Sequence, residues 1–441
     1  MADRQISAAT APKPISAGYS RFALLLLTIV FLVHNLDRQI MSILLVPIQN
    51  ELGASDTAMG FLTGFAFAAV YVSFGIPMAH LCDRGNRRNI LSIVIAVWSG
   101  FTALCGTAVN YVHLLLMRVG VALGEAGGNP ACVSMISDFF PAAQRAMAMG
   151  VFYIGASAGI FFGMWLGGWI NDAMGWRAAF VVVGLPGVLL ALIVRLTLKE
   201  PPRGVSDGLA VDSREAKSFP DVQRLLWSLS TYRRLILGNA CHSIAMYASF
   251  AWAAAYFIRI HGLSTTEVGL RIGLVTGLGA ALGNLVGGYV TDRLSARDKG
   301  WYMGVAGIAN LLSVPLVFAF LNLADADWAI YAYLPMIAFM AASAPAVATV
   351  TQGIVRPEMR SMSYTTQYMV TSLLGMGGGP FLVGLTNDLL APQFGELSIR
   401  YSMLGVIGTT ALICGLTFCW ASRSVGRDMD SAAIKAGSGG V

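Results

Sequence analysis

The stretch Leu32-Val-His-Asn-Leu-Asp-Arg-Gln-Ile-Met41 places two adjacent ionisable residues, Asp37 and Arg38, inside an apolar run that extends from Phe22 to Val46. Such a run is long enough to cross a bilayer, which takes about 20 apolar residues. Charges at that depth are costly and need a partner or a water-filled cavity. We therefore interpret the pair as a functional site. The alternative is an internal ion pair that only fixes helix packing.

The composition excludes an ordinary soluble domain. Of the 441 residues, 56% are hydrophobic and 12% are charged, whereas about a quarter are charged in soluble domains. Mean hydropathy is +0.67. The net charge of +6 fits an excess of Lys and Arg in cytoplasmic loops better than nucleic-acid binding. The six cysteines lie in or beside apolar runs without Cys-x2-Cys spacing, so we expect buried thiols, no metal and no cofactor.

Hydropathy predicts an all-α membrane protein with twelve transmembrane helices. The predicted spans are residues 22–46, 58–81, 89–108, 112–137, 146–170, 178–198, 235–258, 268–291, 301–322, 328–354, 361–387 and 401–422. The expected domains are an N-terminal tail (1–21), a first six-helix half (22–198), a linker (199–234), a second six-helix half (235–422) and a C-terminal tail (423–441).

The linker carries a candidate surface helix. Val222, Leu225, Leu226 and Leu229 recur at helical spacing, which favours a short amphipathic helix on the inner membrane surface. A helix that only joins the two halves is the alternative.

Basic residues in the loops predict the orientation. If the N-terminus is cytoplasmic, the outer loops hold only Arg177, Arg259, Arg271 and Arg400, and the remaining loop and tail cations face the cytoplasm. This asymmetry follows the positive-inside rule, so both termini should be cytoplasmic. The short tails favour a multi-pass protein of the bacterial inner membrane, and we expect a monomer.

Three pairs of motifs recur in the same order in the two halves. Gly168-Trp-Ile-Asn-Asp172 is similar to Gly384-Leu-Thr-Asn-Asp388, and Asp83-Arg84 is similar to Asp292-Arg293. Pro141-x3-Arg145 parallels the segment that ends at Arg360. Such a repeat predicts two related halves, with a substrate cavity between them near the midplane.

At this point the chain resembles the major facilitator superfamily. The loop Ala79-His-Leu-Cys-Asp-Arg-Gly-Asn-Arg-Arg88 is similar to the signature between spans two and three, with Ala79 where glycine is usual. Within the superfamily the chain resembles bacterial spinster-like transporters, through Asp37-Arg38, Arg118-x5-Gly124-Glu125-Ala126 and Asp138-x6-Arg145. His34-Asn35 stand where the family often has Asn-Tyr. The resemblance implies alternating access and proton coupling.

Four residues form the predicted proton-coupling network. Helix geometry places Asp37 and Arg118 at similar depth, and Arg118 and Glu125 on one face of span four. A desolvated carboxylate holds its proton more tightly and a nearby arginine weakens that hold, so a moving cavity can load and release protons. We expect Glu125, deeper and farther from the cluster, to be protonated more easily. Asp37, beside Arg38 and Arg118, should stay ionised.

The predicted substrate site uses some of the same residues. Arg38 and Arg118 favour an anionic or zwitterionic group, with Glu125, His34, Tyr153 and Tyr247 as further candidates. Packing is the alternative for His34 and for both tyrosines. We interpret His242 as a packing histidine.

Charged residues on the inner loops predict a cytoplasmic gate. The candidates are Asp83, Arg84, Arg87, Arg88, Arg145, Asp292, Arg293 and Arg360. Asp83 should face the start of span eleven near Ser361, and Asp292 the start of span five near Ala146, because a helix N-terminus attracts a carboxylate. The alternative for the arginines is that they only set the topology.

A proton-coupled secondary transporter is the leading interpretation. The absence of a Gly-x4-Gly-Lys-Ser/Thr loop disfavours nucleotide-driven pumping, and the absence of catalytic motifs disfavours a membrane enzyme. The resemblance to spinster-like transporters implies an amphipathic lysophospholipid, or a related lipid with an anionic or zwitterionic head group, as the substrate. A small organic anion such as a sugar acid, or export of many drugs, are alternatives, and the direction of transport stays open.

Overall fold

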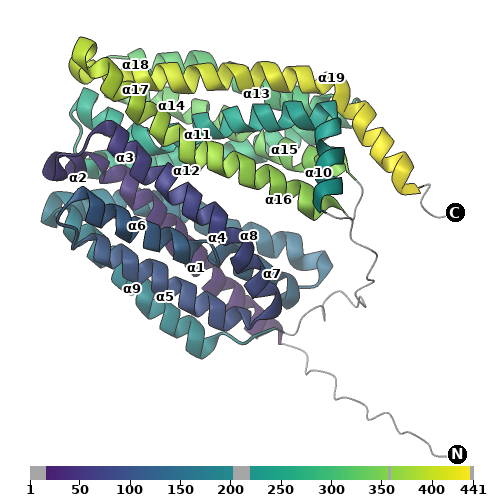
Figure 1. Ribbon diagram of the computed structural model, residues 1–441, viewed down its shortest axis with the longest axis horizontal. Coiled ribbons are helices and arrows are strands. Elements are labelled where there is room, and N and C mark those ends of the chain that lie inside the picture. The colour runs from purple at the N-terminus through teal and green to yellow at the C-terminus, as the bar shows by residue number, and fades with distance from the viewer. Residues whose placement is uncertain (1–15, 202–218, 356–358, 438–441) are drawn as a thin grey trace, which may run out of the picture.

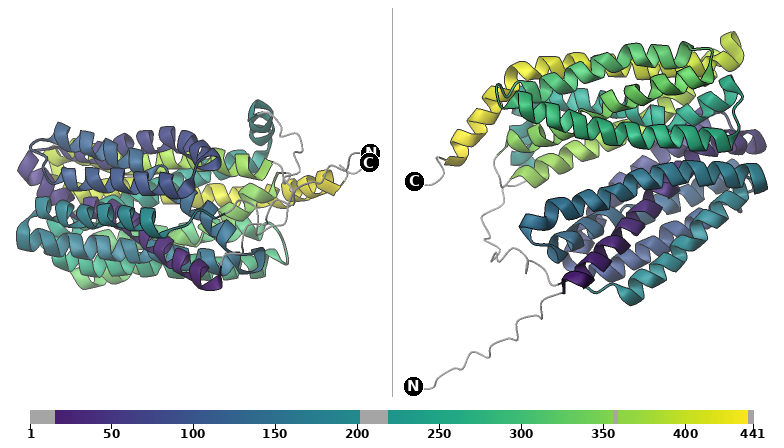
Figure 2. Two further views of the ribbon diagram at one scale, coloured as in Figure 1. Left: turned by 90° about the horizontal axis from the view of Figure 1, so that it is seen from below. Right: turned by 180° about the vertical axis from the view of Figure 1, so that it is seen from behind.

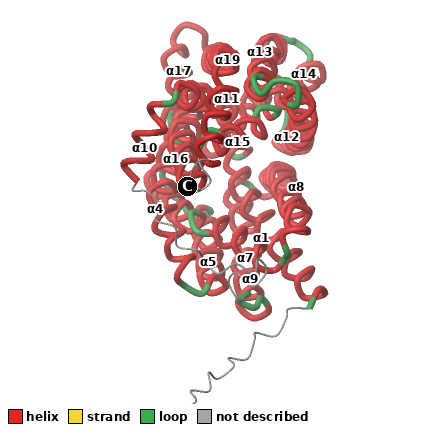
Figure 3. Tube along the Cα trace, turned by 90° about the vertical axis from the view of Figure 1, so that its right-hand side faces the viewer, coloured by secondary structure: helices red, strands yellow, loops and turns green. Residues whose placement is uncertain are grey.

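The structure, a computed structural model, describes residues 16–201, 219–355 and 359–437. Within these ranges it is helical and contains no strand (Figure 3). The first half comprises α1 (Ala17–Ile43), α2 (Leu45–Leu52), α3 (Asp56–Thr63), α4 (Phe65–Arg84), α5 (Arg87–Cys105), α6 (Tyr111–Glu125), α7 (Gly128–Phe139), α8 (Ala142–Met174) and α9 (Trp176–Thr197).

A short helix, α10 (Phe219–Ser228), precedes the second half and falls in the segment where the sequence predicted a linker helix. The second half begins with α11 (Ser230–His261), α12 (Thr265–Ser295), α13 (Trp301–Asn322), α14 (Ala326–Ala341), α15 (Ala344–Gly353) and α16 (Arg360–Thr371). It continues with the π-helix η2 (Ser372–Gly377), α17 (Gly378–Phe394), the 3-10 helix η3 (Gly395–Leu397), α18 (Ser398–Met403), the π-helix η4 (Leu404–Gly408) and α19 (Thr409–Gly437).

The twelve predicted spans all correspond to helices, and span 301–322 coincides with α13. Ten described stretches are long and apolar enough to cross a membrane on their own, and the last of them, Met362–Ser431, contains two spans. The α6–α7 span is not among the ten. It carries Arg118 and Glu125 and breaks after Glu125, so its hydropathy and continuity are both reduced.

The two halves lie side by side and diverge toward one end of the bundle (Figures 1 and 2). We call this end the terminal side, because α1 begins there and α19 ends there (Figure 1). The opposite end, where α3 packs against α17 and α8 against α12, is called the far side. The halves are therefore in close contact on the far side and separate on the terminal side.

Glycines in α8 bring it against α1. A Cβ on Gly159 would collide with the carbonyl oxygen of Leu32, and one on Gly163 would lie 2.6 Å from the carbonyl oxygen of Leu36. Small residues at four-residue spacing allow such close helix contacts in membranes. This close packing against α8 holds α1 and its charged residues in a fixed position.

Candidate functional site

Four ionisable side chains meet between α1 and α6 in the first half. Arg38 Nε donates a hydrogen bond to Glu125 Oε2 at 2.6 Å, and Arg118 Nη1 lies 3.7 Å from Asp37 Oδ1. Thr102 of α5 donates a hydrogen bond to the second oxygen of Asp37. Asp37, Arg118 and Glu125 are buried. The similar depth predicted for Asp37 and Arg118 is therefore confirmed.

The expectation that Glu125 lies away from the arginines is wrong. Glu125 makes the shorter of the two ion pairs, while Asp37 is paired at a longer distance. Side chains on a helix point toward its N-terminus, so the long side chain of Arg38 extends toward the terminal side and reaches Glu125. The expectation treated span four as a straight rod and ignored this reach.

Several polar atoms of this cluster lack a hydrogen-bond partner among the described residues. They are Arg38 Nη2, Arg118 Nε and Nη1, Asp37 Oδ1 and Glu125 Oε1. A buried polar group without a partner is costly, and more so when it is charged. The two guanidinium groups therefore have free donors that an entering anion could satisfy.

Two aromatic rings of α4 cover the arginines. The Arg38 guanidinium lies 4.7 Å from the ring centroid of Tyr71 and 5.3 Å from that of Phe67. Arg118 lies 5.4 Å from Phe67. A cation over an aromatic face is stabilised while it keeps its N–H groups free for a ligand. Sequence analysis missed both rings, although their four-residue spacing in span two places them on one helix face.

His34 lies behind the Glu125 carboxylate. Its Nε2 is 3.8 Å from Glu125 Oε2, and its ring packs edge-on against Trp98 at 5.7 Å. His34 is buried and Nδ1 has no hydrogen-bond partner among the described residues. His34 therefore contacts Glu125 and is not among the described residues that line the central pocket.

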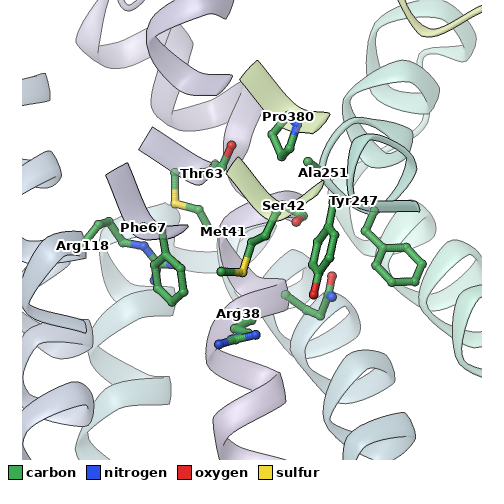
Figure 4. Close-up of a pocket in the computed structure, with 12 residues that line it drawn as sticks. Arg38, Met41, Ser42, Thr63, Phe67, Arg118, Tyr247, Ala251 and Pro380 are labelled. Atoms are coloured by element: carbon green, nitrogen blue, oxygen red, sulfur yellow. The ribbon is translucent and has the colours of Figure 1, made fainter. Parts of the chain in front are cut away.

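A cavity of about 80 Å³, here called the central pocket, opens beside Arg38 and Arg118 and is shared by the two halves. Figure 4 shows the first-half residues Arg118 and Phe67 on one side of Arg38 and the second-half residue Tyr247 on the other. Ser42 also lines the pocket. The predicted candidates Arg38, Arg118 and Tyr247 thus meet at one cavity.

A larger cavity of about 410 Å³, the vestibule, lies toward the terminal side between α4, α7 and α16. Most of its lining is apolar, with Asn129 and His80 among the polar residues. Tyr71 of the first half and Tyr368 of the second both line the vestibule. This pair spans the interface between the halves near the cation site.

Tyr153 has a different position from the other candidates. Half of the residue is exposed, and its ring packs edge-on against Phe31 at 5.8 Å. It is not among the described residues that line the central pocket or the vestibule. A packing role accounts for these contacts.

One polar tie closes the far side between α3 and the second half. Both oxygens of Asp56 accept hydrogen bonds from Arg259 of α11, at 2.7 and 2.9 Å. Asn387 donates to the same carboxylate. In return, the Asp388 carboxylate accepts hydrogen bonds from the backbone N–H groups of Asp56 and Thr57, at 3.1 and 2.8 Å. Asp388 therefore caps the N-terminus of α3 across the interface between the halves.

A second tie repeats this arrangement between α8 and α12. Asp172 accepts hydrogen bonds from the Thr265 hydroxyl at 2.6 Å and from the backbone N–H of Thr266 at 2.8 Å. Both Asp172 and Asp388 end the Gly-x-x-Asn-Asp motifs that the sequence identified as a repeat. Together the two ties form what we call the far-side lock, which sequence analysis missed because each acceptor is far along the chain from its donors.

The predicted gate residues make contacts within their own halves. Arg87 is buried and bonds Asp138 at 2.5 Å and Glu200 at 2.8 Å. Arg145 donates to the carbonyl oxygen of Ser137. Arg88 Nε donates to Asn89 and Arg293 donates to Tyr289, each within its own half, whereas Arg84 and Asp292 are exposed. The side chains of Asp83 and Arg360 lie outside the described part. A closed terminal-side gate stays a prediction.

Comparison with known proteins gives concordant results. The sequence profile described as Major Facilitator Superfamily matches residues 27–380. An MFS-type efflux pump of Mycolicibacterium smegmatis is 30% identical over 408 residues, covering 91% of this chain and 92% of the pump. A probable L-galactonate transporter of Escherichia coli is 31% identical over 282 residues, covering 62% of this chain and 61% of the relative.

A solved structure matches most of the chain. It is described as a bacterial homologue of the human lysosomal transporter Spinster in an inward-facing and unoccupied conformation. It aligns with a TM-score of 0.85 and 29% identity, covering 94% of this chain and 99% of the solved chain.

Proposed function

Because the chain belongs to the major facilitator superfamily and is spinster-like within it, we propose that it is a proton-coupled secondary transporter of an organic anion. The family and fold are those of transporters, not of enzymes. The observation that carries the proposal is the position of Arg38. It is bonded to the fully buried Glu125 on one side and lines the central pocket on the other.

This position couples the anion to a proton. An anion that enters the central pocket competes with Glu125 for the Arg38 guanidinium, which matches carboxylate and phosphate oxygens. Once Arg38 turns to the anion, Glu125 is a buried carboxylate without its cation, a state costly enough that the group takes up a proton. Each anion bound is therefore accompanied by a proton, and release of either restores the pair.

Asp37 and Arg118 have a supporting role. Their pair, with Thr102, balances the cluster at two positive and two negative charges. Arg118 is the second cation of the central pocket and the second anion ligand. His34, beside Glu125, provides a proton site adjacent to the coupling carboxylate.

Alternating access would exchange the far-side lock for a gate on the terminal side. The closed far side and the vestibule on the terminal side correspond to one of the two states. In the other state the Asp83, Asp292 and Arg360 region would close, with Arg84, Arg87, Arg88, Arg145 and Arg293 as its cations. The basic loops of the terminal side support a cytoplasmic location for it. The protein would then be a monomer in a bacterial inner membrane.

Two substrate classes fit the anion site. The geometry best supports a small organic anion such as a sugar acid, because the central pocket is narrow and cationic. An amphipathic lysophospholipid, the class predicted from the sequence, is supported by the largely apolar vestibule, which could hold an acyl chain. Relatives named as an efflux pump and as a galactonate transporter support neither class exclusively.

The test uses the full-length protein reconstituted in liposomes that contain a pH-sensitive dye. Gluconate or a lysophospholipid is added with and without an imposed pH gradient. We expect the transported anion to move protons with it, and Arg38→Gln to abolish both movements. Anion movement that carries no proton and ignores the gradient would contradict the proposal.

A further inference from the structure

A third cavity of about 230 Å³ lies entirely within the second half, and we call it the side pocket. It is formed by α11, α15, α16 and the start of η2. Tyr247 lines both the side pocket and the central pocket, so the two cavities lie next to each other. The function proposed above makes no use of the side pocket.

The side pocket is lined by apolar side chains and by several uncharged polar ones, and none of its described lining residues is Asp, Glu, Lys or Arg. Asn239, His242, Gln367 and Ser372 all line it, and each is at least nine-tenths buried. Within the described part of the chain, the side-chain amides of Asn239 and Gln367 make no hydrogen bond to protein. Buried amides normally find partners, so these groups are available to a ligand.

Hydrogen bonding defines the tautomer of His242. Asn310 donates its amide N–H to the carbonyl oxygen of Ala306, and its side-chain oxygen lies 3.1 Å from His242 Nδ1. Because that oxygen is an acceptor, Nδ1 must carry the hydrogen. The neutral ring then leaves Nε2 as a hydrogen-bond acceptor. The sequence-based interpretation of His242 as a packing residue therefore accounts for only one of its two nitrogens.

The backbone of the pocket wall is also specialised. The π-helix η2 begins at Ser372, and Gly375 within it packs so tightly on Ser243 that a Cβ would collide. Single π-helical turns inside α-helices are frequent at functional sites. Here the turn lies where two hydroxyl side chains, Thr371 and Ser372, line the pocket.

We propose that the side pocket binds a hydroxyl-rich group of the same substrate whose acidic group binds at Arg38. This inference rests on the proposed function and adds the substrate class, a polyhydroxylated anion. A hydroxyl both donates and accepts, and so do the amides of Asn239 and Gln367. A charged group would find no counter-charge among the lining residues. An acyl chain would leave the buried amides unpaired, which is costly.

Two kinds of molecule carry an acid beside hydroxyl groups. A sugar acid places its polyol directly in the side pocket. A lysophospholipid with a glycerol head group places the glycerol there and its acyl chain in the vestibule. The shared chemistry is an anion with adjacent hydroxyls, and matched ligands separate the two sources.

The experiment measures equilibrium binding to the full-length protein in nanodiscs. Labelled gluconate is competed with hexanoate, which has the same chain length but no hydroxyls. Labelled lysophosphatidylglycerol is competed with lysophosphatidic acid of the same acyl chain, which lacks the head-group glycerol. We expect one of the two labelled probes to bind. Its competitor, which lacks the polyol of gluconate or the head-group glycerol, should compete at least about tenfold more weakly, because a site built for hydroxyls rejects analogues without them.

Substitutions in the side pocket test whether the hydroxyl groups bind there. Gln367→Leu and Asn239→Leu, on different helices, should each weaken binding of the hydroxylated probe about tenfold. Gln352→Leu makes the same chemical change at an exposed position of α15 outside the pocket lining and should bind normally. Thermal unfolding checks that each variant is folded.

Three outcomes overturn the inference. Binding of neither hydroxylated probe removes the substrate class. Equal competition by hexanoate or lysophosphatidic acid removes the role of the hydroxyls. Normal binding in both pocket variants removes the site. The second and third outcomes can be told apart from a failure of the proposed transport function. If Arg38→Gln still abolishes binding of the probe and protons still accompany the transported anion, the transport function stands and only the polyol inference fails.

Discussion

Arg38 Nε donates a hydrogen bond to Glu125 Oε2 across 2.6 Å, and the two side chains differ sharply in access. Glu125 is 0% exposed, whereas 22% of the Arg38 side chain is exposed. A ligand can therefore reach the cation but not the carboxylate. When Arg38 leaves Glu125, the negative charge of the carboxylate must be neutralised by a proton, on Glu125 itself or on His34. Among the described residues, Arg38 and His34 are the cationic partners within ion-pair distance of Glu125, and His34 is a cation only when it is protonated.

Glu125→Gln should uncouple transport from protons. The amide cannot take up a proton, yet it can still accept a hydrogen bond from Arg38 and preserve the packing. We expect accumulation driven by a pH gradient to fall at least about a hundredfold, within the range lost when a positioned proton-transfer group is removed. Gradient-free exchange of internal for external substrate should persist, and the two assays are run on the same proteoliposomes.

The pH dependence of the variant provides the control. Wild-type uptake should accelerate as the substrate side becomes more acidic, because protonation of Glu125 frees Arg38 for the anion. In Glu125→Gln the exchange rate should be nearly independent of pH. If the pH dependence is unchanged in the variant, Glu125 is not the group whose protonation drives transport, and Asp37 becomes the next candidate.

Arg38→Lys should retain the charge and lose most of the function. A lysine ammonium cannot make bidentate contacts to an anion or stack on aromatic faces as the planar guanidinium does over Tyr71 and Phe67. Truncating one side of a buried charged pair typically costs about 2–5 kcal/mol. We expect substrate affinity to fall by at least about tenfold, as measured by binding to the purified protein. Arg118→Lys should show a smaller loss, since its pair with Asp37 is longer.

Asp388→Asn should loosen the far-side lock. The amide can present only one oxygen to the two backbone N–H groups at the start of α3, and loss of a cap costs about 1 kcal/mol. The population should shift toward the state open on the far side, by about fivefold for that free energy. Distances between spin labels on the far-side ends of α3 and α17 report the shift. Glu396→Gln, at an exposed far-side position, is the matched control and should leave the distance distribution unchanged.

Most of the fold could be predicted from the sequence because hydropathy acts locally. Span 301–322 coincides with α13, and the charged span one is α1. The helix breaks could not be predicted. At the break in span two, Gly64 lies so close to the backbone oxygen of Gly377 that a Cβ would collide with it, and Gly377 belongs to the other half.

In the candidate site, too, some features could be predicted from the sequence and others could not. Asp37, Arg38, Arg118 and Glu125 could be identified because charges in apolar runs are rare. Their pairing could not be identified, because the direction and length of the Arg38 side chain decide which carboxylate it bonds. The far-side lock was invisible for a related reason. Asp388 looks like an ordinary loop carboxylate until α3 is placed against it.

Gly159→Ala should destabilise the protein although it adds only one methyl group. The new Cβ would collide with the backbone of α1 at Leu32, five residues before Asp37, and backbone cannot move aside as a flexible side chain can. Overpacking of this kind costs about 1–3 kcal/mol, so we expect lower thermal stability in detergent and weaker substrate binding through displacement of α1. Gly150→Ala makes the same change in the same helix, where a Cβ has open space, and should unfold at the wild-type temperature or slightly above it. If both variants behave alike, the contact between α8 and α1 does not position the charged cluster, and the fixed geometry of Asp37 and Arg38 must come from the other helices that pack against α1, among them α5, α7, α9 and α11.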